Sequence, residues 1–245
     1  AVLATRLSED PSLKVLLVEA GPDYPNFDEL PDEIRQGHAT GTDLAVDPSG
    51  IHNWAFTGKA TPQNMDMAVP RGKITGGTSA INGQVYLRPI PEDFDMWVDA
   101  GNDEWSYDKS LPYMIKLEND LDFTDRYHGN DGPIVVRRYQ PDELVDDQAA
   151  FITAVTDAGF AITHDHNHPA SSGVGPLPLN NPDGIRWSTA LGYLTMARDR
   201  ANFTLSADSH TTRILIENTK AVGIDYIKNG KLKQEHVQRY VSAEW

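Results

Sequence analysis

The sequence predicts a mixed α/β fold, and three stretches carry this prediction. A helical pattern over residues 1–10 leads into KVLLVEAG, a continuous apolar run from Lys14 to Gly21 that is typical of a buried parallel strand. The stretch PRGKITGGTSAING, Pro70 to Gly83, places two adjacent glycines before hydroxyl side chains. From Asn202 onward the chain alternates apolar and polar residues and contains the hairpin turn Asn229-Gly230. An α/β nucleotide domain with strand-rich insertions fits all three.

Composition and charge exclude several classes of function. The 245 residues suffice for one large domain or two small ones. The chain has 21 Lys and Arg against 36 Asp and Glu, a net charge of −15, which argues against nucleic acid or an anionic membrane as partner. No apolar run approaches the roughly 20 residues of a membrane span. There is no cysteine, hence no disulfide or cysteine-ligated metal. We predict no metal site and take the cytoplasm as the default compartment.

Glu19 ends the first predicted strand, which we expect to be buried on both faces. A helix followed by such a strand is the second half of a βαβ unit. In dinucleotide-binding units an acidic residue about 20 positions after a glycine turn binds the ribose. No G-x-G-x-x-G occurs in the chain, and counting back from Glu19 places that turn just before Ala1. The sequence is therefore expected to be a piece of a longer chain. The alternative for Glu19 is a solvated acid at the end of a strand, with no role in binding.

The glycine-rich stretch is the main candidate ligand site. Gly76 and Gly77 remove side chains at consecutive positions, which lets the backbone lie against a flat or anionic ligand. Asn82 can both donate and accept hydrogen bonds, and Arg71 and Lys73 would balance a pyrophosphate. An ordinary surface turn is the alternative interpretation.

The sequence of the middle of the chain predicts a series of short helices and strands joined by loops. Residues 22–66 are expected to form long irregular surface loops. QVYLRPIPEDFDMW predicts a strand and then an acidic helix, and the segment from Trp105 predicts a helix that starts or kinks at Pro112. GPIVVRRY predicts a strand, and PDELVDDQAAFITAVTDAGF a helix that stops at Gly159. Three or four antiparallel strands are expected from Asn202 onward.

Several other residues allow two interpretations. His164, His166 and His168 would project to one side of an extended chain as metal ligands do, but their polar neighbours favour an exposed loop. His128 is either a turn histidine or a catalytic one, with the turn favoured. Ser188 is best explained as a helix cap.

Together the motifs resemble one family, the glucose-methanol-choline (GMC) flavoprotein oxidoreductases, along the whole chain. The matching stretches follow the family's order: AVLATRLSEDPSLKVLLVEAGP, PRGKITGGTSAINGQVYLRP, DFDMW with WSYDKSLPYMIKLE, YHGNDGPI, GIRWSTALGYL and NFTLSADSHTTRILIENTKAVGI.

The resemblance implies FAD as cofactor and an incomplete Rossmann-like FAD-binding domain with a strand-rich antiparallel substrate-binding domain. The expected boundaries are 1–95 for the first part of the FAD domain with its lid loop, 96–195 for the substrate domain, and 196–245 for the return to the FAD domain. Glu19 would bind the adenosine ribose, and the backbone of Thr211 would contact adenine. The pyrophosphate and flavin edge would be lined by Arg71, Gly72, Lys73, Gly76, Gly77, Thr78, Ser79, Asn82 and Gly83.

Three positions depart from the family pattern. Ile81 stands where members with covalently attached flavin have His, which implies non-covalent FAD. Thr75 replaces the usual Leu, and Pro89 stands where Gly is common, so the lid over the flavin would differ locally.

The implied reaction is oxidation of a small-molecule alcohol to an aldehyde or ketone by hydride transfer to flavin N5, with oxygen, a quinone or another group as electron acceptor. The family's second signature and catalytic His pair would lie beyond Trp245, so no catalytic residue is assigned, and the chain alone is expected to be inactive. The alternatives are a lyase or a fatty acid photodecarboxylase on the same scaffold, or a non-catalytic fragment.

Overall fold

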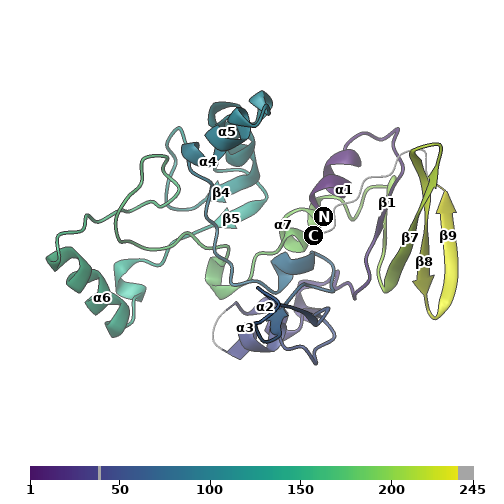
Figure 1. Cartoon of the computed structure of the whole chain (residues 1–245), viewed down its shortest axis with the longest axis horizontal. Coiled ribbons are helices and arrows are strands. Elements are labelled where there is room, and N and C mark those ends of the chain that lie inside the picture. Colours follow the sequence, from purple (N-terminus) through teal and green to yellow (C-terminus); the bar gives the residue numbers. More distant parts are fainter. Residues whose placement is uncertain (38–39, 237–245) are drawn as a thin grey trace. The chain divides into compact units, whose positions relative to one another are not determined.

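A computed structural model describes residues 1–37 and 40–236 of the chain (Figure 1). The chain forms two compact units: the first comprises Ala1–Gly83 and Ser188–Trp245, and the second comprises Gln84–Trp187. Among the described residues, no helix is long and apolar enough to cross a membrane.

The first unit begins with the predicted helix and strand. Helix α1 (Val2–Leu7) leads to strand β1 (Val15–Val18), which pairs in parallel with β6 (Phe203–Ser206). Within the described chain β6 is the one strand that pairs with β1, and Leu16 is 38% exposed. The expectation that β1 is buried on both faces is therefore wrong. Since β6 is parallel to β1, it is also not a fourth strand of the antiparallel meander.

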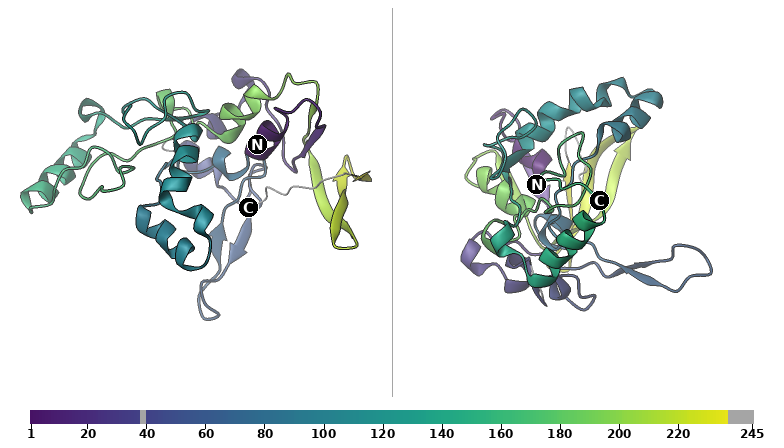
Figure 2. Two further views of the ribbon diagram at one scale, coloured as in Figure 1. Left: turned by 90° about the horizontal axis from the view of Figure 1, so that it is seen from above. Right: turned by 90° about the vertical axis from the view of Figure 1, so that its left-hand side faces the viewer.

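The region between residues 22 and 66 contains more structure than its composition predicts. It holds η1 (Phe27–Glu29), α2 (Asp32–Arg35), α3 (Thr40–Ala45) and β2 (Phe56–Gly58), which pairs antiparallel with β3 (Met67–Val69). The β2–β3 hairpin extends away from the helices of its unit (Figure 2). The helices enclose a small apolar core with the glycine-rich segment, made of Leu30, Ile34, Ala45, Ile74, Ala80 and Ile81.

The end of the described chain is an antiparallel sheet, as predicted. It consists of β7 (Ser209–Glu217), β8 (Lys220–Lys228) and β9 (Lys231–His236). Asn229 and Gly230 join β8 to β9 with φ angles of 52° and 70°, the left-handed pair that a tight hairpin turn requires. Short helices α7 (Thr189–Gly192) and η6 (Leu194–Met196) precede β6. Ser188 caps α7 as expected, since its hydroxyl accepts a hydrogen bond from Leu191 N at 3.4 Å.

The second unit combines helices with one short parallel strand pair. Its elements are α4 (Pro91–Asp99), η3 (Asp103–Trp105), α5 (Tyr107–Leu117), β4 (Glu118–Asp120), β5 (Ile134–Val136), η4 (Pro141–Glu143), α6 (Asp146–Asp157) and η5 (Pro182–Gly184). Strand β4 pairs with β5 in parallel.

Most elements of the second unit match the predictions. The strand in GPIVVRRY is β5, and Gly159 follows the last turn of α6 with φ of 93°. Helix α5 begins at Tyr107 and passes through Pro112, so Pro112 does not mark its start. The strand predicted directly before α4, in residues 84–90, does not form; Val85 instead makes an isolated bridge to Leu179.

Candidate functional site

The glycine-rich segment of the first unit starts as a short ladder. The backbone N–H of Lys73 donates to the carbonyl of His52 at 2.8 Å, and Trp54 N donates to Arg71 O at 2.9 Å. The amide oxygen of Asn53 accepts from Arg71 N at 3.2 Å. These bonds fix the backbone just before the glycines.

The glycine pair then turns the chain through conformations that disfavour side chains. Gly76 and Gly77 have φ angles of 99° and 59° and lead into the 3₁₀ turn η2 (Gly77–Ala80). A Cβ on Gly76 would lie 3.1 Å from the Ala190 methyl, whereas a Cβ on Gly77 or Gly83 would meet nothing within 4 Å. The segment is therefore packed on one side and open at Gly77 and Gly83.

The two hydroxyls that follow stabilise the turn itself. Thr78 Oγ1 accepts from Gly72 N at 3.1 Å. Ser79 Oγ lies 2.7 Å from Gly76 O, to which it donates, and accepts from Thr189 N at 3.0 Å. Direct contact of Thr78 and Ser79 with a cofactor stays a prediction. Their hydrogen bonds stabilise the conformation of the loop.

Glu19 and Thr211 are brought close together by pairing at the end of β1. The Glu19 carboxylate accepts from Gly21 N at 2.8 Å, and its carbonyl accepts from Ser209 N at 2.8 Å. Thr211 lies two residues further along β7. Both residues are half-buried. The acid at the strand end thus adjoins the strand that carries the predicted adenine contact.

Close backbone contacts join Glu19's segment to the glycine loop. A Cβ on Gly21 would lie 1.9 Å from Lys73 O, so the two backbones touch there. Thr75 N donates to Pro22 O at 3.0 Å. The segment that follows Glu19 and the start of the glycine loop are therefore direct neighbours in the first unit.

The remaining predicted residues lie around this loop. Arg71 is exposed, and its guanidinium donates to Pro70 O at 2.8 Å. The Lys73 ammonium lies 5.3 Å from the Trp54 ring centroid. Asn82 is half-buried.

An aromatic cluster that the sequence did not predict lies beside Lys73. Trp54 stacks on Phe56 at 5.7 Å between ring centroids and meets His210 edge-on at 5.2 Å. The alternation in HNWAF was the available signal for Trp54 and Phe56. His210 carried no such signal, because only the fold brings β7 to this segment.

Two of the residues that depart from the family pattern, Thr75 and Ile81, are buried. Thr75 is 4% exposed, and its hydroxyl has no hydrogen-bond partner among the described residues. Ile81 is 1% exposed and packs in the apolar core formed with α2 and α3.

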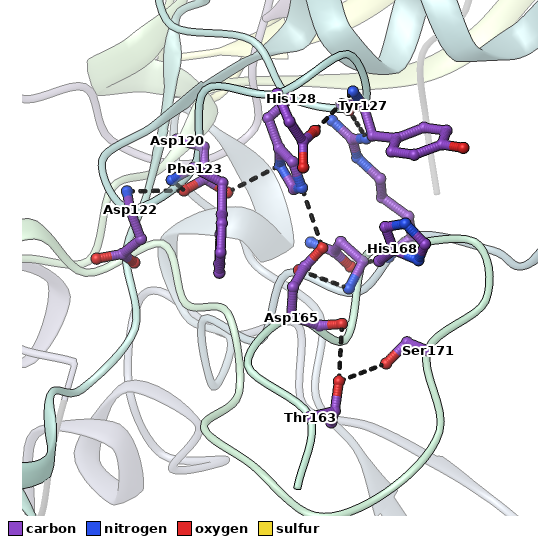
Figure 3. A network of polar contacts seen from close by, with 12 residues as sticks. Asp120, Asp122, Phe123, Tyr127, His128, Thr163, Asp165, His168 and Ser171 are labelled. Atoms are coloured by element: carbon purple, nitrogen blue, oxygen red, sulfur yellow. Dashed lines mark hydrogen bonds and ion pairs between the residues drawn. The ribbon is translucent and has the colours of Figure 1, made fainter.

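The second unit contains a buried ionic network centred on His128 (Figure 3). Its Nδ1 lies 3.1 Å from a carboxylate oxygen of Glu118 and 3.1 Å from one of Asp120. Its Nε2 lies 3.0 Å from Asp165. The His128 side chain is fully buried. Its backbone N–H donates to Asp125 O at 3.2 Å, so His128 ends a turn, as the favoured interpretation expected.

Two arginines complete the charge balance. Arg138 donates to Asp120 at 2.9 Å and to Asp165 at 2.8 Å. Arg88 pairs with Glu118. The three buried carboxylates of Glu118, Asp120 and Asp165 thus face two guanidinium groups and the imidazole, and protonated His128 balances their charge. Asp122 adds a partly exposed fourth carboxylate, 3.4 Å from Arg138.

The network sets the protonation of His128. Burial by itself would lower the pKa of His128, but hydrogen bonds to Asp120, Asp165 and Glu118 outweigh burial and raise it to about 11. Burial would also raise the pKa of Asp165, yet the bond to His128 and other contacts lower it to about 2. His128 is therefore an imidazolium at neutral pH and is unsuited to act as a general base.

Ligand atoms of Glu118, Asp120 and His128 all lie within 4.8 Å of one another, as in a metal site. A metal ligand, however, must be a neutral imidazole with a free ring nitrogen. Here both ring nitrogens point at carboxylates, and the arginines already balance the acids. The chemistry of this cluster favours a structural ion network over a cation site.

The three histidines of HDHNHP do not converge. His166 Nε2 lies 3.2 Å from Gly175 O, and His168 Nδ1 accepts from Ala170 N at 3.2 Å. His164 is exposed. The three side chains do not project to one side of an extended strand, because the chain turns at residues 166–170.

Known proteins resemble this chain along nearly its whole length. Residues 32–245 match the family model described as GMC oxidoreductase. An uncharacterized GMC-type oxidoreductase of Rhodococcus erythropolis is 38% identical over 240 residues, which are 98% of this chain and 47% of that protein. The oxygen-dependent choline dehydrogenase 1 of Chromohalobacter salexigens is 39% identical over 251 residues, 98% of this chain and 42% of that protein.

Solved structures agree with this result and confirm the mixed α/β fold. Pyridoxine 4-oxidase from Mesorbium loti superimposes with a TM-score of 0.85 at 29% identity, covering 96% of this chain and 45% of that one. An FAD-dependent oxidoreductase from Chaetomium thermophilum gives 0.82 at 25% identity, with 96% and 42% covered. The chain thus spans less than half the length of the relatives it matches.

Proposed function

Because the chain belongs to the GMC oxidoreductase family, we propose that it forms the FAD-side loop region of an enzyme that oxidises an alcohol to an aldehyde or ketone. The first unit then corresponds to part of the FAD-binding domain and the second to part of a substrate-binding domain.

The observation that supports this proposal most is the continuous set of contacts in the first unit. Thr211 follows Ser209, which bonds Glu19, and the segment after Glu19 touches the glycine loop at Lys73 and Thr75. Residues far apart in the sequence thus surround one region. Its glycines Gly77 and Gly83 leave room for a ligand.

In this proposal the predicted site residues divide among the parts of FAD. Glu19 accepts hydrogen bonds from the ribose hydroxyls, and the Thr211 backbone contacts adenine. Arg71 and Lys73 balance the pyrophosphate charge. Gly72, Gly76, Gly77, Thr78, Ser79, Asn82 and Gly83 bring the backbone close to the pyrophosphate and flavin edge. When bound, FAD supplies a flavin N5 that accepts a hydride from the alcohol carbon.

The cofactor is proposed to be bound without a covalent link. Ile81 occupies the position at which an imidazole would attach the flavin, and it is a buried hydrocarbon side chain. Affinity then comes from polar contacts and shape alone, so the flavin should be released on denaturation.

No catalytic base is assigned within the described residues. His128 is held as an imidazolium by three carboxylates. His52 is 5% exposed and bonded to Tyr24. The proton of the alcohol is therefore proposed to pass to a residue outside these two positions.

The experiment is flavin spectroscopy on the full-length protein. The purified protein should show flavin absorption that bleaches anaerobically on addition of its alcohol. Choline is the first alcohol to test, since choline dehydrogenases are among the relatives. Oxygen uptake compared with reduction of a quinone analogue then identifies the electron acceptor.

Three outcomes separate the alternatives. Acid precipitation should leave the flavin in the supernatant; flavin that stays on the protein contradicts non-covalent binding. Flavin that no alcohol reduces contradicts the oxidoreductase and favours a lyase or photodecarboxylase. A full-length protein without flavin contradicts the proposal as a whole.

A further inference from the structure

A buried histidine lies where the two halves of the proposed cofactor site meet. His52 belongs to the segment that pairs with the start of the glycine loop, and its carbonyl accepts from Lys73 N at 2.8 Å. Its side chain is 6% exposed, so its ring nitrogens need partners within the protein. No motif in the sequence pointed to it.

The ring of His52 has a partner at each nitrogen. Nε2 lies 2.8 Å from the hydroxyl oxygen of Tyr24, and Nδ1 lies 3.5 Å from a carboxylate oxygen of Glu33 on α2. Tyr24 also meets the ring edge-on, at 5.7 Å between centroids. A carboxylate can only accept, so Nδ1 carries the proton and Nε2 accepts the Tyr24 O–H.

The neutral form of His52 suits this arrangement. Burial lowers the pKa of His52 and outweighs the opposing effect of the Glu33 carboxylate. At neutral pH the ring therefore keeps one donor and one acceptor, which matches its two partners.

Tyr24 closes a ring of contacts around the site. It follows Gly21 and Pro22, which continue directly from Glu19 and touch the glycine loop at Lys73 and Thr75. The side chain of His52 contacts Tyr24, and the His52 carbonyl accepts from Lys73 N in the glycine loop. A side-chain link and two backbone contacts thus hold the acidic strand end and the glycine loop together.

We propose that Tyr24, His52 and Glu33 form a positioning triad that fixes the distance between Glu19 and the glycine loop, so that both can bind one dinucleotide. This inference rests on the proposed function. The three residues act through the backbone and need not touch the cofactor. Fixing the site before binding lowers the ordering cost of association.

The test compares cofactor affinity with apo-protein stability in the full-length protein. Tyr24→Phe removes one oxygen and leaves the Nε2 acceptor buried without its donor. We expect FAD, titrated into apo-protein, to bind about tenfold more weakly. His52→Leu should weaken it at least as much, whereas His52→Gln, which keeps a polar acceptor near Nε2, should recover most of the affinity. The matched control is Tyr139→Phe, which removes a hydroxyl bonded to Asn181 in the second unit and should change nothing in FAD binding.

Each other outcome has a defined meaning. If Tyr24→Phe and His52→Leu bind FAD like the wild type, the triad is overturned. If affinity falls only in proportion to the lost free energy of apo-protein unfolding and His52→Gln gives no rescue, the residues are general packing elements, and the triad is again overturned. A wild type that binds no FAD overturns the proposed function and with it this inference.

Discussion

The Nε2 atom of His128 lies 3.0 Å from a carboxylate oxygen of Asp165, and this contact joins residues from two separate loops of the second unit. The same imidazole also contacts Glu118 and Asp120, so one ring holds three segments of chain together. Since its charge completes the balance of the cluster, the stability of the second unit should depend on whether His128 is protonated.

This dependence predicts a specific pH profile. The pKa of His128 is about 11 in the folded protein against 6.5 ordinarily, so its stabilisation is complete below pH 6.5 and is lost as the pH rises towards 11. The pKa of Asp165 is about 2 against 3.8, so its stabilisation is complete above pH 3.8 and is lost as the pH falls towards 2.

The free energy of unfolding should therefore decline above pH 6.5, with His128 contributing up to about 1.4 kcal/mol per pH unit. In His128→Gln this contribution disappears. The measurement is urea unfolding of both proteins between pH 5 and 10, in intervals of about one unit. Parallel curves for the two proteins would contradict the assignment of an imidazolium.

Chelation should leave the second unit unchanged. The ligand atoms of Glu118, Asp120 and His128 lie close enough for a cation, but each group is already ion-paired. Dialysis against EDTA is expected to shift the melting temperature by less than about 1 °C, since we expect ion pairs and not a metal to stabilise the cluster. A larger drop that Zn²⁺ or Mn²⁺ restores would show that the cluster holds a metal.

Two glycines of the loop should respond differently to alanine. In Gly72→Ala the new methyl would lie 2.3 Å from Gly77 O, so the backbone has to move. We expect a loss of about 1–3 kcal/mol in unfolding free energy together with weaker FAD binding. In Gly83→Ala the methyl meets nothing within 4 Å, so stability should stay within about 0.5 kcal/mol while FAD affinity falls. Equal FAD affinity in Gly83→Ala and wild type would remove Gly83 from the cofactor site.

Thr75 offers a stabilising substitution. Its buried hydroxyl has no hydrogen-bond partner within residues 1–37 and 40–236, so Thr75→Val should raise the free energy of unfolding by about 1 kcal/mol. The matched control is Thr5→Val: Thr5 is equally buried, but its hydroxyl donates to Tyr193 O at 3.2 Å, and its loss should cost about 1 kcal/mol. A destabilised Thr75→Val would indicate that the hydroxyl has a partner such as an internal water.

The sequence predicted those features that local patterns determine. The apolar run ending at Glu19 and the hairpin turn at Asn229-Gly230 each depend on a few adjacent residues. Both the strand and the turn form where they were predicted, although the strand is not buried on both faces. The glycine loop was likewise recognisable, because paired glycines mark a backbone that side chains would obstruct.

The missed features depend on contacts between distant segments. Strand β4 reads Glu-Asn-Asp, which no hydrophobic pattern identifies as a buried strand. Its carboxylates are buried only because Arg88, His128 and Arg138 arrive from other segments. Tyr24 and His52 meet for the same reason, and the spacing of the two residues along the chain carries no sign of their contact.

The parallel pairing of β1 with β6 has a consequence for synthesis. The second unit is one continuous segment, whereas the first unit lies on both sides of it in the sequence. At about 5–20 residues per second, β6 leaves the ribosome on the order of 10–40 s after β1. During this interval β1 has an unpaired edge while the complete second unit can already fold. The edge of β1 that β6 later covers is therefore open to pairing with other strands throughout this interval.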